Sequence, residues 1–170
     1  FDLGARDLAG ELCEVLQTVG VLARFSRLVA DPNRPTEAED LFRASAEGRP
    51  IAMNRSVDAI DRGRRLHLWE KYHHAHHREV ERSRSEILPA VHTFTPMYEG
   101  MPRQMEVGVL FDEEEALAET VRAELASDGF VVAMNAPYSG KDGLMYSVDR
   151  HAKQHGRREL TVDDRHGHER

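Results

Sequence analysis

The chain has 170 residues, 40% of them hydrophobic, which is enough to bury one core and predicts a single domain over residues 1–170. The formal net charge is −7 and no long basic run occurs, so no nucleic-acid partner is expected. No apolar run approaches the roughly 20 residues that span a bilayer, so no membrane partner is expected and a cytoplasmic location is predicted. Composition does not distinguish a monomer from an oligomer.

The first predicted element is an amphipathic helix over about residues 5–19, with Gly20 as its stop. Cys13 is the only cysteine, and its place in the apolar spacing of this helix favours core packing over a reactive thiol. A single cysteine also excludes an intrachain disulfide. Because the first residue is Phe and a helical pattern begins almost at once, we expect an upstream strand and loop of the domain to precede this sequence.

Residues 21–30 are predicted to form a buried strand that leads into a polar loop. The loop reads Asp31-Pro32-Asn33-Arg34-Pro35. A carboxylate, an amide and a guanidinium so close together are suited to binding an anion, although Asp and Asn can also simply shape their own turn. Residues 35–50 are polar and aperiodic, which predicts a surface loop.

A long, charged helix is predicted from Asp58 to about Arg84. It carries a histidine cluster in which His73 and His77 lie four residues apart on one face, a workable spacing for a divalent metal. A histidine-helix metal-binding module is therefore one alternative for this protein. The stronger interpretation is a charged surface helix that tolerates histidines without binding metal.

The second half of the chain alternates short strands with helices. Strands are predicted at 87–91, 105–111, 130–134 and 159–162, and helices from about 112 to 127 and 147 to 155. Asp112 and Glu115 are expected to cap the first of these helices, and the very hydrophobic run 130–134 is expected to be a central strand. This alternation predicts an α/β fold with a mainly parallel or mixed sheet flanked by helices.

Polar side chains follow four of the predicted strands: Arg34, His92, Asn135 and Asp163. In open α/β sheets, ligands bind just outside the carboxyl ends of the strands, so we expect these residues to share one cavity. An arginine, an imidazole, an amide and a carboxylate together suit hydrolysis of a small acidic substrate.

Three motifs, in order, carry a resemblance to a known family. They are Ser26-Arg27-Leu28-Val29-Ala30-Asp31-Pro32-Asn33-Arg34-Pro35, His92-Thr93-Phe94-Thr95-Pro96 and Asn135-Ala136-Pro137-Tyr138-Ser139-Gly140. Through them the chain resembles the N-formylglutamate amidohydrolase family over nearly its whole length. The resemblance implies a fold similar to zinc carboxypeptidases and aspartoacylases. It also implies zinc-assisted hydrolysis of an N-acyl amino acid, such as N-formylglutamate, to the free amino acid and a carboxylic acid.

The resemblance further implies roles for the substrate-binding residues. Asn33 and Arg34 are similar to the pair that binds the substrate's carboxylate, and a guanidinium fork can bind both oxygens at once. Asn135 and Tyr138 would line the same site, although their loop is also rich in turn-forming residues. The expected ligand is a small acidic N-acyl amino acid.

For the chemistry, the resemblance implies that His92 is a zinc ligand and that Arg27 lies near the reacting carbonyl. Asp163 falls where the family has a glutamate that acts as general base on the zinc-bound water. Aspartate is one methylene shorter, and a displacement of about an ångström can cost on the order of a hundredfold in rate. Asp2 is a candidate second zinc ligand. A non-catalytic relative that keeps an anion pocket without a metal centre is the other alternative, and His92 as a structural histidine is compatible with it.

Overall fold

The computed structural model describes residues 2–46, 48–98 and 100–165. The chain forms two compact units: Val21–Arg84 belong to the first, and Asp2–Gly20 with Ser85–Arg170 belong to the second. Each unit is described by itself. The single domain over residues 1–170 stays a prediction, because a division into compact units describes packing rather than independent folding.

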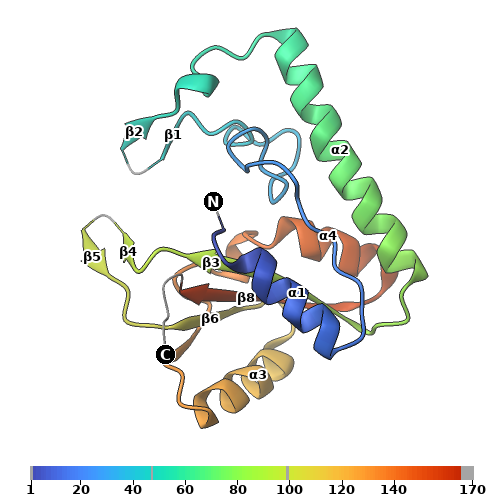
Figure 1. The fold of residues 1–170 in the computed structure, drawn as a ribbon, viewed down its shortest axis with the longest axis vertical. Helices are drawn as coiled ribbons and strands as arrows, with labels where there is room; N and C mark the ends of the chain where they lie inside the picture. The colour runs from blue at the N-terminus through green and yellow to red at the C-terminus, as the bar shows by residue number, and fades with distance from the viewer. Residues whose placement is uncertain (1, 47, 99, 166–170) are drawn as a thin grey trace. The chain divides into compact units, whose positions relative to one another are not determined.

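The first unit consists of a long irregular segment, a short hairpin and one long helix (Figure 1). The hairpin pairs β1 (Ser45–Ala46) with β2 (Arg49–Pro50), and a short 3-10 helix, η1, spans Ala52–Asn54. The helix α2 (Ala59–Arg82) confirms the predicted long helix. Its N-cap is Asp58, whose side chain accepts a hydrogen bond from the Asp61 amide and so satisfies one of the free donors at the helix start.

The strand predicted over residues 21–30 is wrong. The backbone there is irregular, and a turn is closed by the Val29 amide donating to the Ser26 carbonyl at 2.9 Å. The apolar run is interrupted at Arg24 and again at Ser26 and Arg27, and Leu22 is 45% exposed. A hydrophobic run becomes a strand only where a sheet edge is available to pair with it, and none pairs with this segment.

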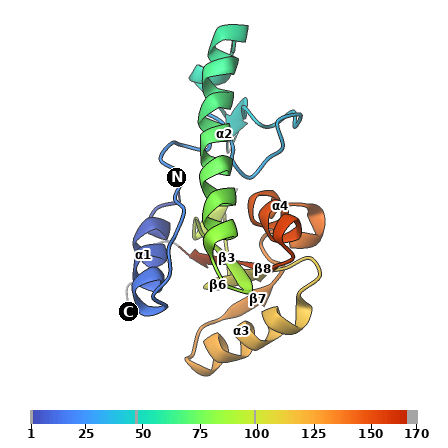
Figure 2. The same ribbon diagram turned by 90° about the vertical axis from the view of Figure 1, so that its right-hand side faces the viewer.

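The second unit is built on a four-stranded sheet in the order β3-β8-β6-β7 (Figure 2). Its strands are β3 (Ile87–Phe94), β8 (Arg158–Arg165), β6 (Val107–Leu110) and β7 (Val132–Met134). Strand β3 pairs parallel with β8, β6 pairs parallel with β7, and β6 pairs antiparallel with β8. The sheet is therefore mixed, one of the two arrangements that the sequence predicted. A separate hairpin joins β4 (Met97–Tyr98) to β5 (Met101–Pro102).

The antiparallel step corrects two expectations about this sheet. Strands β3 and β8 run in the direction opposite to β6 and β7, so the carboxyl ends of the two pairs lie at opposite ends of the sheet. Contrary to the prediction, Asn135, which follows β7, therefore does not lie at the same end of the sheet as the carboxyl ends of β3 and β8. The run 130–134 forms an edge strand rather than a central one, because β8 returns from the end of the chain to lie between β3 and β6.

Helices cover both faces of the sheet: α4 (Tyr146–His155) lies on one side and α3 (Glu115–Ser127) on the other (Figure 2). Consecutive residues of a strand point to opposite faces. Accordingly, Val109 packs in a cluster with Ala118 of α3, whereas Leu110 packs in a second cluster with Val148 of α4. None of the described helices is long and apolar enough to cross a membrane.

The helix α1 (Ala5–Val15) packs against β3 and ends before the predicted Gly20. It ends because Gln17 adopts a left-handed backbone with φ of 51°. The Thr18 amide then donates to the Cys13 carbonyl at 2.9 Å, which closes the last turn. Gly20 instead permits a close approach, since a Cβ at that position would lie 2.9 Å from the half-buried Cys13 Sγ.

The predicted cap of α3 is also wrong in detail. Its N-cap residue is Glu114, without a capping side-chain hydrogen bond, and Asp112 instead lies 3.5 Å from the Lys153 ammonium of α4. The predicted helix ends are confirmed at Gly129 and Gly156, which have φ of 91° and 60°. Glycine tolerates this conformation without a steric penalty.

Candidate functional site

Asp31 organises the polar loop of the first unit. Its Oδ2 accepts hydrogen bonds from Arg27 Nε at 3.1 Å and Nη2 at 2.8 Å, and its Oδ1 accepts one from the Asn33 amide at 3.0 Å. The Asp31 side chain is buried, so this carboxylate both fixes the turn and neutralises Arg27. Arg27 is therefore held in one orientation, while its proposed place near a reacting carbonyl stays a prediction.

Arg34 is oriented by two neighbours in the same loop. Its Nε lies 2.8 Å from Asp40 Oδ2, and its Nη1 donates to the Asn33 carbonyl at 2.9 Å. Burial raises the pKa of Asp40, but the hydrogen bond and positive charge of Arg34 outweigh this and lower that pKa overall. These contacts involve Nε and Nη1 of Arg34, and they fix the orientation of the whole guanidinium.

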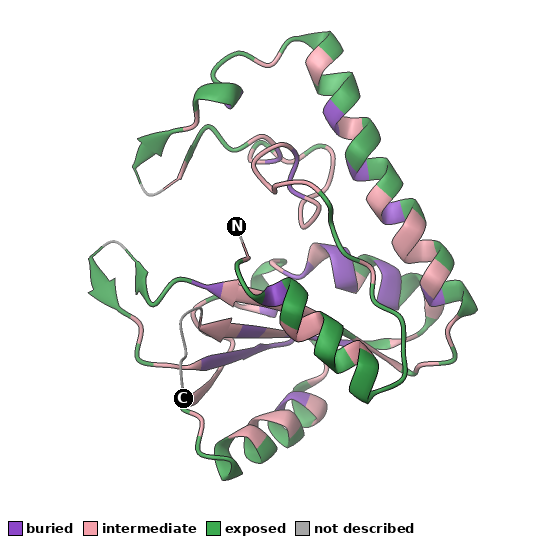
Figure 3. Cartoon of the chain, viewed as in Figure 1, coloured by how far each residue is buried: buried purple, intermediate pink, exposed green. Residues whose placement is uncertain are grey.

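A buried stripe of α2 supports this loop from the helix side. Residues 65, 69 and 73 lie on one helix face, and the buried residues recur along α2 in Figure 3. Trp69 Nε1 donates to the Arg34 carbonyl at 3.0 Å, and His73 Nε2 lies 3.0 Å from the Pro32 carbonyl. Arg65 Nη2 donates to the Met53 carbonyl at 2.8 Å. The stripe therefore holds the backbone that carries Arg34.

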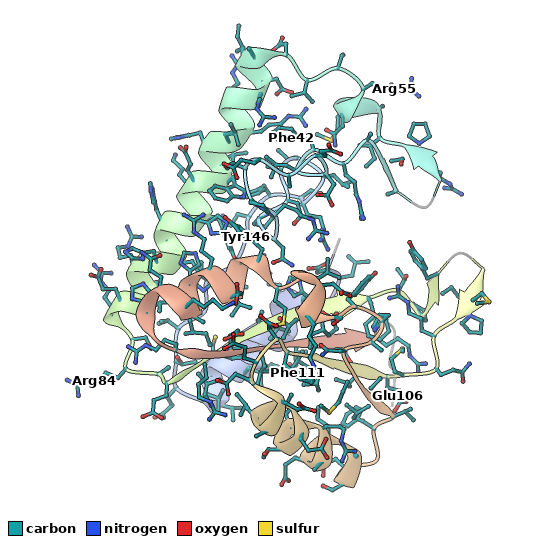
Figure 4. The ribbon with its side chains drawn as sticks, turned by 180° about the vertical axis from the view of Figure 1, so that it is seen from behind. Phe42, Arg55, Arg84, Glu106, Phe111 and Tyr146 are labelled. Atoms are coloured by element: carbon teal, nitrogen blue, oxygen red, sulfur yellow. The ribbon has the colours of Figure 1, made fainter. Side chains whose placement is uncertain are left out.

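Arg65 and Trp69 are supporting residues that were not predicted from the sequence. Their spacing of four residues is typical of one helix face. The pattern did not predict a buried face, because one of the two residues is a charged arginine. Arg65 is only 6% exposed because Asp61 pairs with it and because its guanidinium lies over the ring of Phe42, labelled in Figure 4. His73 Nε2 lies against a backbone carbonyl, which disfavours this ring nitrogen as a metal ligand in the histidine-helix alternative.

In the second unit, His92 Nδ1 lies 2.8 Å from Asp2 Oδ2. Asp2, the candidate second zinc ligand, therefore lies next to His92, and the ligand roles of both stay predictions. A carboxylate on one ring nitrogen fixes the orientation and tautomer of an imidazole, as it does for metal-bound histidines. His92 lies within β3 rather than after it, because β3 continues to Phe94.

Asp163 lies beside His92 in the sheet. The two residues are register partners on β3 and β8, and Gly108 of β6 is the next partner across. Paired residues of neighbouring strands point to the same face, which here is the face covered by α4. Asp163 is 4% exposed and lies inside β8, not after a strand as predicted.

Gly108 gives the following loop access to this face of the sheet. A Cβ at Gly108 would lie 2.5 Å from the Ala136 carbonyl oxygen, so only glycine allows the loop after β7 to lie against the strand here. No role was predicted for this glycine, although a glycine inside a strand often marks such a close approach. The loop contains a cis peptide bond between Ala136 and Pro137.

Asn135 and Tyr138 occupy different parts of that loop. Asn135 has a left-handed backbone, and its Oδ1 accepts hydrogen bonds from the amides of Phe111 and Gly140 at 3.0 and 3.1 Å. The side-chain oxygen of Asn135 therefore shapes the loop. Tyr138 is 41% exposed, and its hydroxyl accepts a hydrogen bond from Arg103 Nη2 at 3.1 Å. The substrate-binding roles of both residues stay predictions.

Comparison with known proteins decides the family. The profile of the N-formylglutamate amidohydrolase family matches residues 1–163. The chain belongs to the N-formylglutamate amidohydrolase family. The crystal structure of gene product Atu2144 from Agrobacterium tumefaciens is similar, with a TM-score of 0.87 and 29% sequence identity over 97% of this chain and 68% of that chain. No curated protein matches the chain.

Membership in the N-formylglutamate amidohydrolase family implies a hydrolase that acts on an amide bond. A catalytic zinc in such an enzyme normally has three protein ligands. Across residues 2–46, 48–98 and 100–165, no group of three or more His, Cys, Asp or Glu side chains is placed to hold a metal ion. His92 and Asp2 supply one imidazole and one carboxylate, so the described side chains do not complete a zinc site.

Proposed function

We propose that this amidohydrolase cleaves the amide bond of N-formylglutamate or a closely similar N-acyl amino acid, releasing the free amino acid and a carboxylic acid. The family match supports the reaction class. The observation that carries the substrate class is the Arg34 guanidinium, which Asp40 orients and whose backbone Trp69 holds. A cation that is already held in place binds a carboxylate with a smaller loss of side-chain freedom.

In this proposal, Asn33 and Arg34 bind the substrate's carboxylate and Arg27 lies near the reacting carbonyl. In the second unit, Asp2 orients His92, and Asp163 accepts a proton from the attacking water. The buried position of Asp163 next to His92 supports its role as a base.

A substrate panel tests the proposal. Formate or acid release is measured with N-formylglutamate, N-formylglutamine, N-acetylglutamate and a glutamate-containing dipeptide. We expect the highest kcat/KM for N-formylglutamate, because the neutral side chain of N-formylglutamine cannot form an ion pair with an arginine. Absence of hydrolysis for every N-acyl amino acid in the panel would contradict the proposed function.

Zinc dependence and a carboxypeptidase-like architecture are proposed on the family resemblance, with His92 as the ligand that this chain contributes. Elemental analysis of zinc-supplemented protein measures the stoichiometry. We expect His92→Ala to lose the zinc and the His73→Ala, His77→Ala double variant to retain it. The reverse result would favour the histidine-helix module, and a wild-type protein without stoichiometric zinc would contradict zinc dependence.

A non-catalytic carboxylate-binding relative is the second candidate. It is favoured by the lack of a three-ligand group in the part of the chain that the structure describes. This candidate predicts that the wild-type protein binds glutamate but does not hydrolyse any substrate of the panel, even with added zinc. Turnover of N-formylglutamate would exclude it.

A further inference from the structure

Arg103 of the second unit lies among three aromatic rings. Its guanidinium carbon is 5.1 Å from the centre of the Phe94 ring, 5.0 Å from that of Tyr98 and 5.2 Å from that of Tyr138. The rings come from three separate segments: β3, β4 and the loop after β7. The aromatic rings therefore hold the guanidinium in a defined place, through cation–π contacts and through the hydrogen bond from Nη2 to the Tyr138 hydroxyl.

Three other arginines have a carboxylate partner, which Arg103 lacks among the described residues. Arg27, Arg34 and Arg65 each pair with an aspartate. Arg103 forms no ion pair with any carboxylate in residues 2–46, 48–98 and 100–165, and its Nη1 is buried without a hydrogen-bond partner there. A buried donor of a charged group is unfavourable unless an acceptor satisfies it.

The surroundings of Arg103 do not supply that acceptor. Arg165 donates to the Arg103 carbonyl at 3.3 Å, so a second guanidinium lies on the backbone side. The Arg165 guanidinium itself lies 3.7 Å from Glu106, the nearby acidic residue labelled in Figure 4. The local charge around Arg103 is thus not balanced by the carboxylates that the structure describes, which favours binding of an anion.

Arg103 also borders the face of the sheet that carries His92 and Asp163. Phe94 follows His92 by two residues in β3, so both side chains point to the same face. The loop that carries Tyr138 lies against Gly108, the register partner of Asp163. The rings that hold Arg103 therefore belong to the same face as the candidate catalytic groups.

We propose that Arg103 binds a carboxylate group of the substrate through its Nη1 edge. Phe94, Tyr98 and Tyr138 act as positioning residues, because they hold the plane of the guanidinium; Nη2 donates to the Tyr138 hydroxyl, and Nη1 is left for the ligand. The identity of the substrate as an N-acyl dicarboxylic amino acid rests on the proposed function above.

Calorimetric titration with glutamate tests the proposal without requiring turnover. Arg103→Gln removes the charge, Arg103→Lys keeps the charge but not the fork, and Arg150→Gln is the matched control. Arg150 also donates to a tyrosine hydroxyl, that of Tyr146, but it is exposed on α4. We expect glutamate affinity to fall about tenfold or more in Arg103→Gln and several-fold in Arg103→Lys, and to be unchanged in Arg150→Gln.

The same variants, assayed for hydrolysis, locate the carboxylate. A KM increase for N-formylglutamate but not for N-formylglutamine assigns Arg103 to the side-chain carboxylate, and an increase for both assigns it to the α-carboxylate. Arg103-dependent glutamate binding in a wild-type protein that hydrolyses nothing would support the site and contradict the proposed function, so the two failures are distinguishable.

Two results would overturn the proposal. The first is wild-type protein that does not bind glutamate. The second is wild-type affinity in both Arg103 variants; if circular dichroism shows that Arg103→Gln is unfolded, Arg103→Lys alone decides.

Discussion

Arg34 pairs with Asp40 of its own loop, which orients its guanidinium for substrate binding. In Arg34→Ala, we expect KM for N-formylglutamate to rise about 10- to 100-fold, since a charge-assisted fork is lost. The free energy of unfolding should change little, because the side chain fills no core position. Steady-state kinetics and urea unfolding measure both quantities.

Asp40→Asn is the matched control for that variant. It keeps the Arg34 guanidinium but weakens the contact that orients it at 2.8 Å, so a smaller KM increase is expected. An unchanged KM in Arg34→Ala would contradict the assignment of the loop as the carboxylate-binding site.

Asp2 acts on His92 through a hydrogen bond to the ring. Asp2→Asn keeps the shape of the side chain but removes the charge that fixes the imidazole at 2.8 Å. We expect kcat/KM to fall about 10- to 100-fold, as for other carboxylate partners of functional histidines. Asp7→Asn, on the exposed side of α1, should leave kcat/KM unchanged. Equal activity of the two variants would show that Asp2 has no role in the reaction.

At the scale of elements, α2 positions the polar loop through the donors on its buried stripe. Trp69→Phe keeps an aromatic ring but removes the Nε1 donor, which leaves the Arg34 carbonyl without this partner. We expect a loss of about 1–3 kcal/mol in the free energy of unfolding, measured by urea denaturation. Leu68→Ala, at a position that is 38% exposed, should change it by less than about 1 kcal/mol. Equal losses in the two variants would contradict the positioning role.

The loop after β7 depends on the Asn135 side chain in the same way. Asn135→Ala removes the acceptor for two backbone amides and places alanine at φ of 49°. We expect a destabilisation of about 2–4 kcal/mol. Asn135→Asp keeps an acceptor oxygen and tolerates this backbone, so it should lose less than half as much. Thermal unfolding compares the two, and identical melting temperatures would show that Asn135 does not shape the loop.

The elements also show where sequence patterns were sufficient. The helix from Asp58 and the helix ended by Gly156 were predicted closely, since capping residues and spacing are local properties. Residues 21–30 were mispredicted as a strand because strand formation depends on a partner elsewhere in the chain. The strands of His92 and Asp163 were predicted too short, since pairing between β3 and β8 extends both through polar residues.

At the scale of the whole molecule, Glu159 couples stability to pH. It is 5% exposed on β8, and burial, followed by repulsion from Asp149, raises its pKa from 4.5 to about 7, although Lys153 opposes the shift. Between these two values the folded protein binds a proton that the unfolded chain has released. Stability therefore falls as pH rises from about 4.5 to about 7, by up to roughly 3 kcal/mol from this group.

Glu159→Gln tests this pH dependence. The amide cannot ionise, so the contribution of this group to the slope of unfolding free energy against pH should disappear. Urea denaturation at several pH values across the window measures the slope for wild type and variant. The same slope in both proteins would show that Glu159 does not cause the dependence.

The sequence by itself determined the family, the α/β class, the start of α2 at its Asp58 cap, the end of α4 at Gly156, and the residues of three motifs. These features follow from local propensity and from residue identity, which are both written along the chain. The tertiary structure decided which strands pair and in which direction, and thus that Asp163 lies next to His92 while Asn135 follows a strand of opposite direction. It also decided that Arg103 lies among three rings without a described counterion. Such juxtapositions join residues that are far apart in sequence, so no local pattern encodes them.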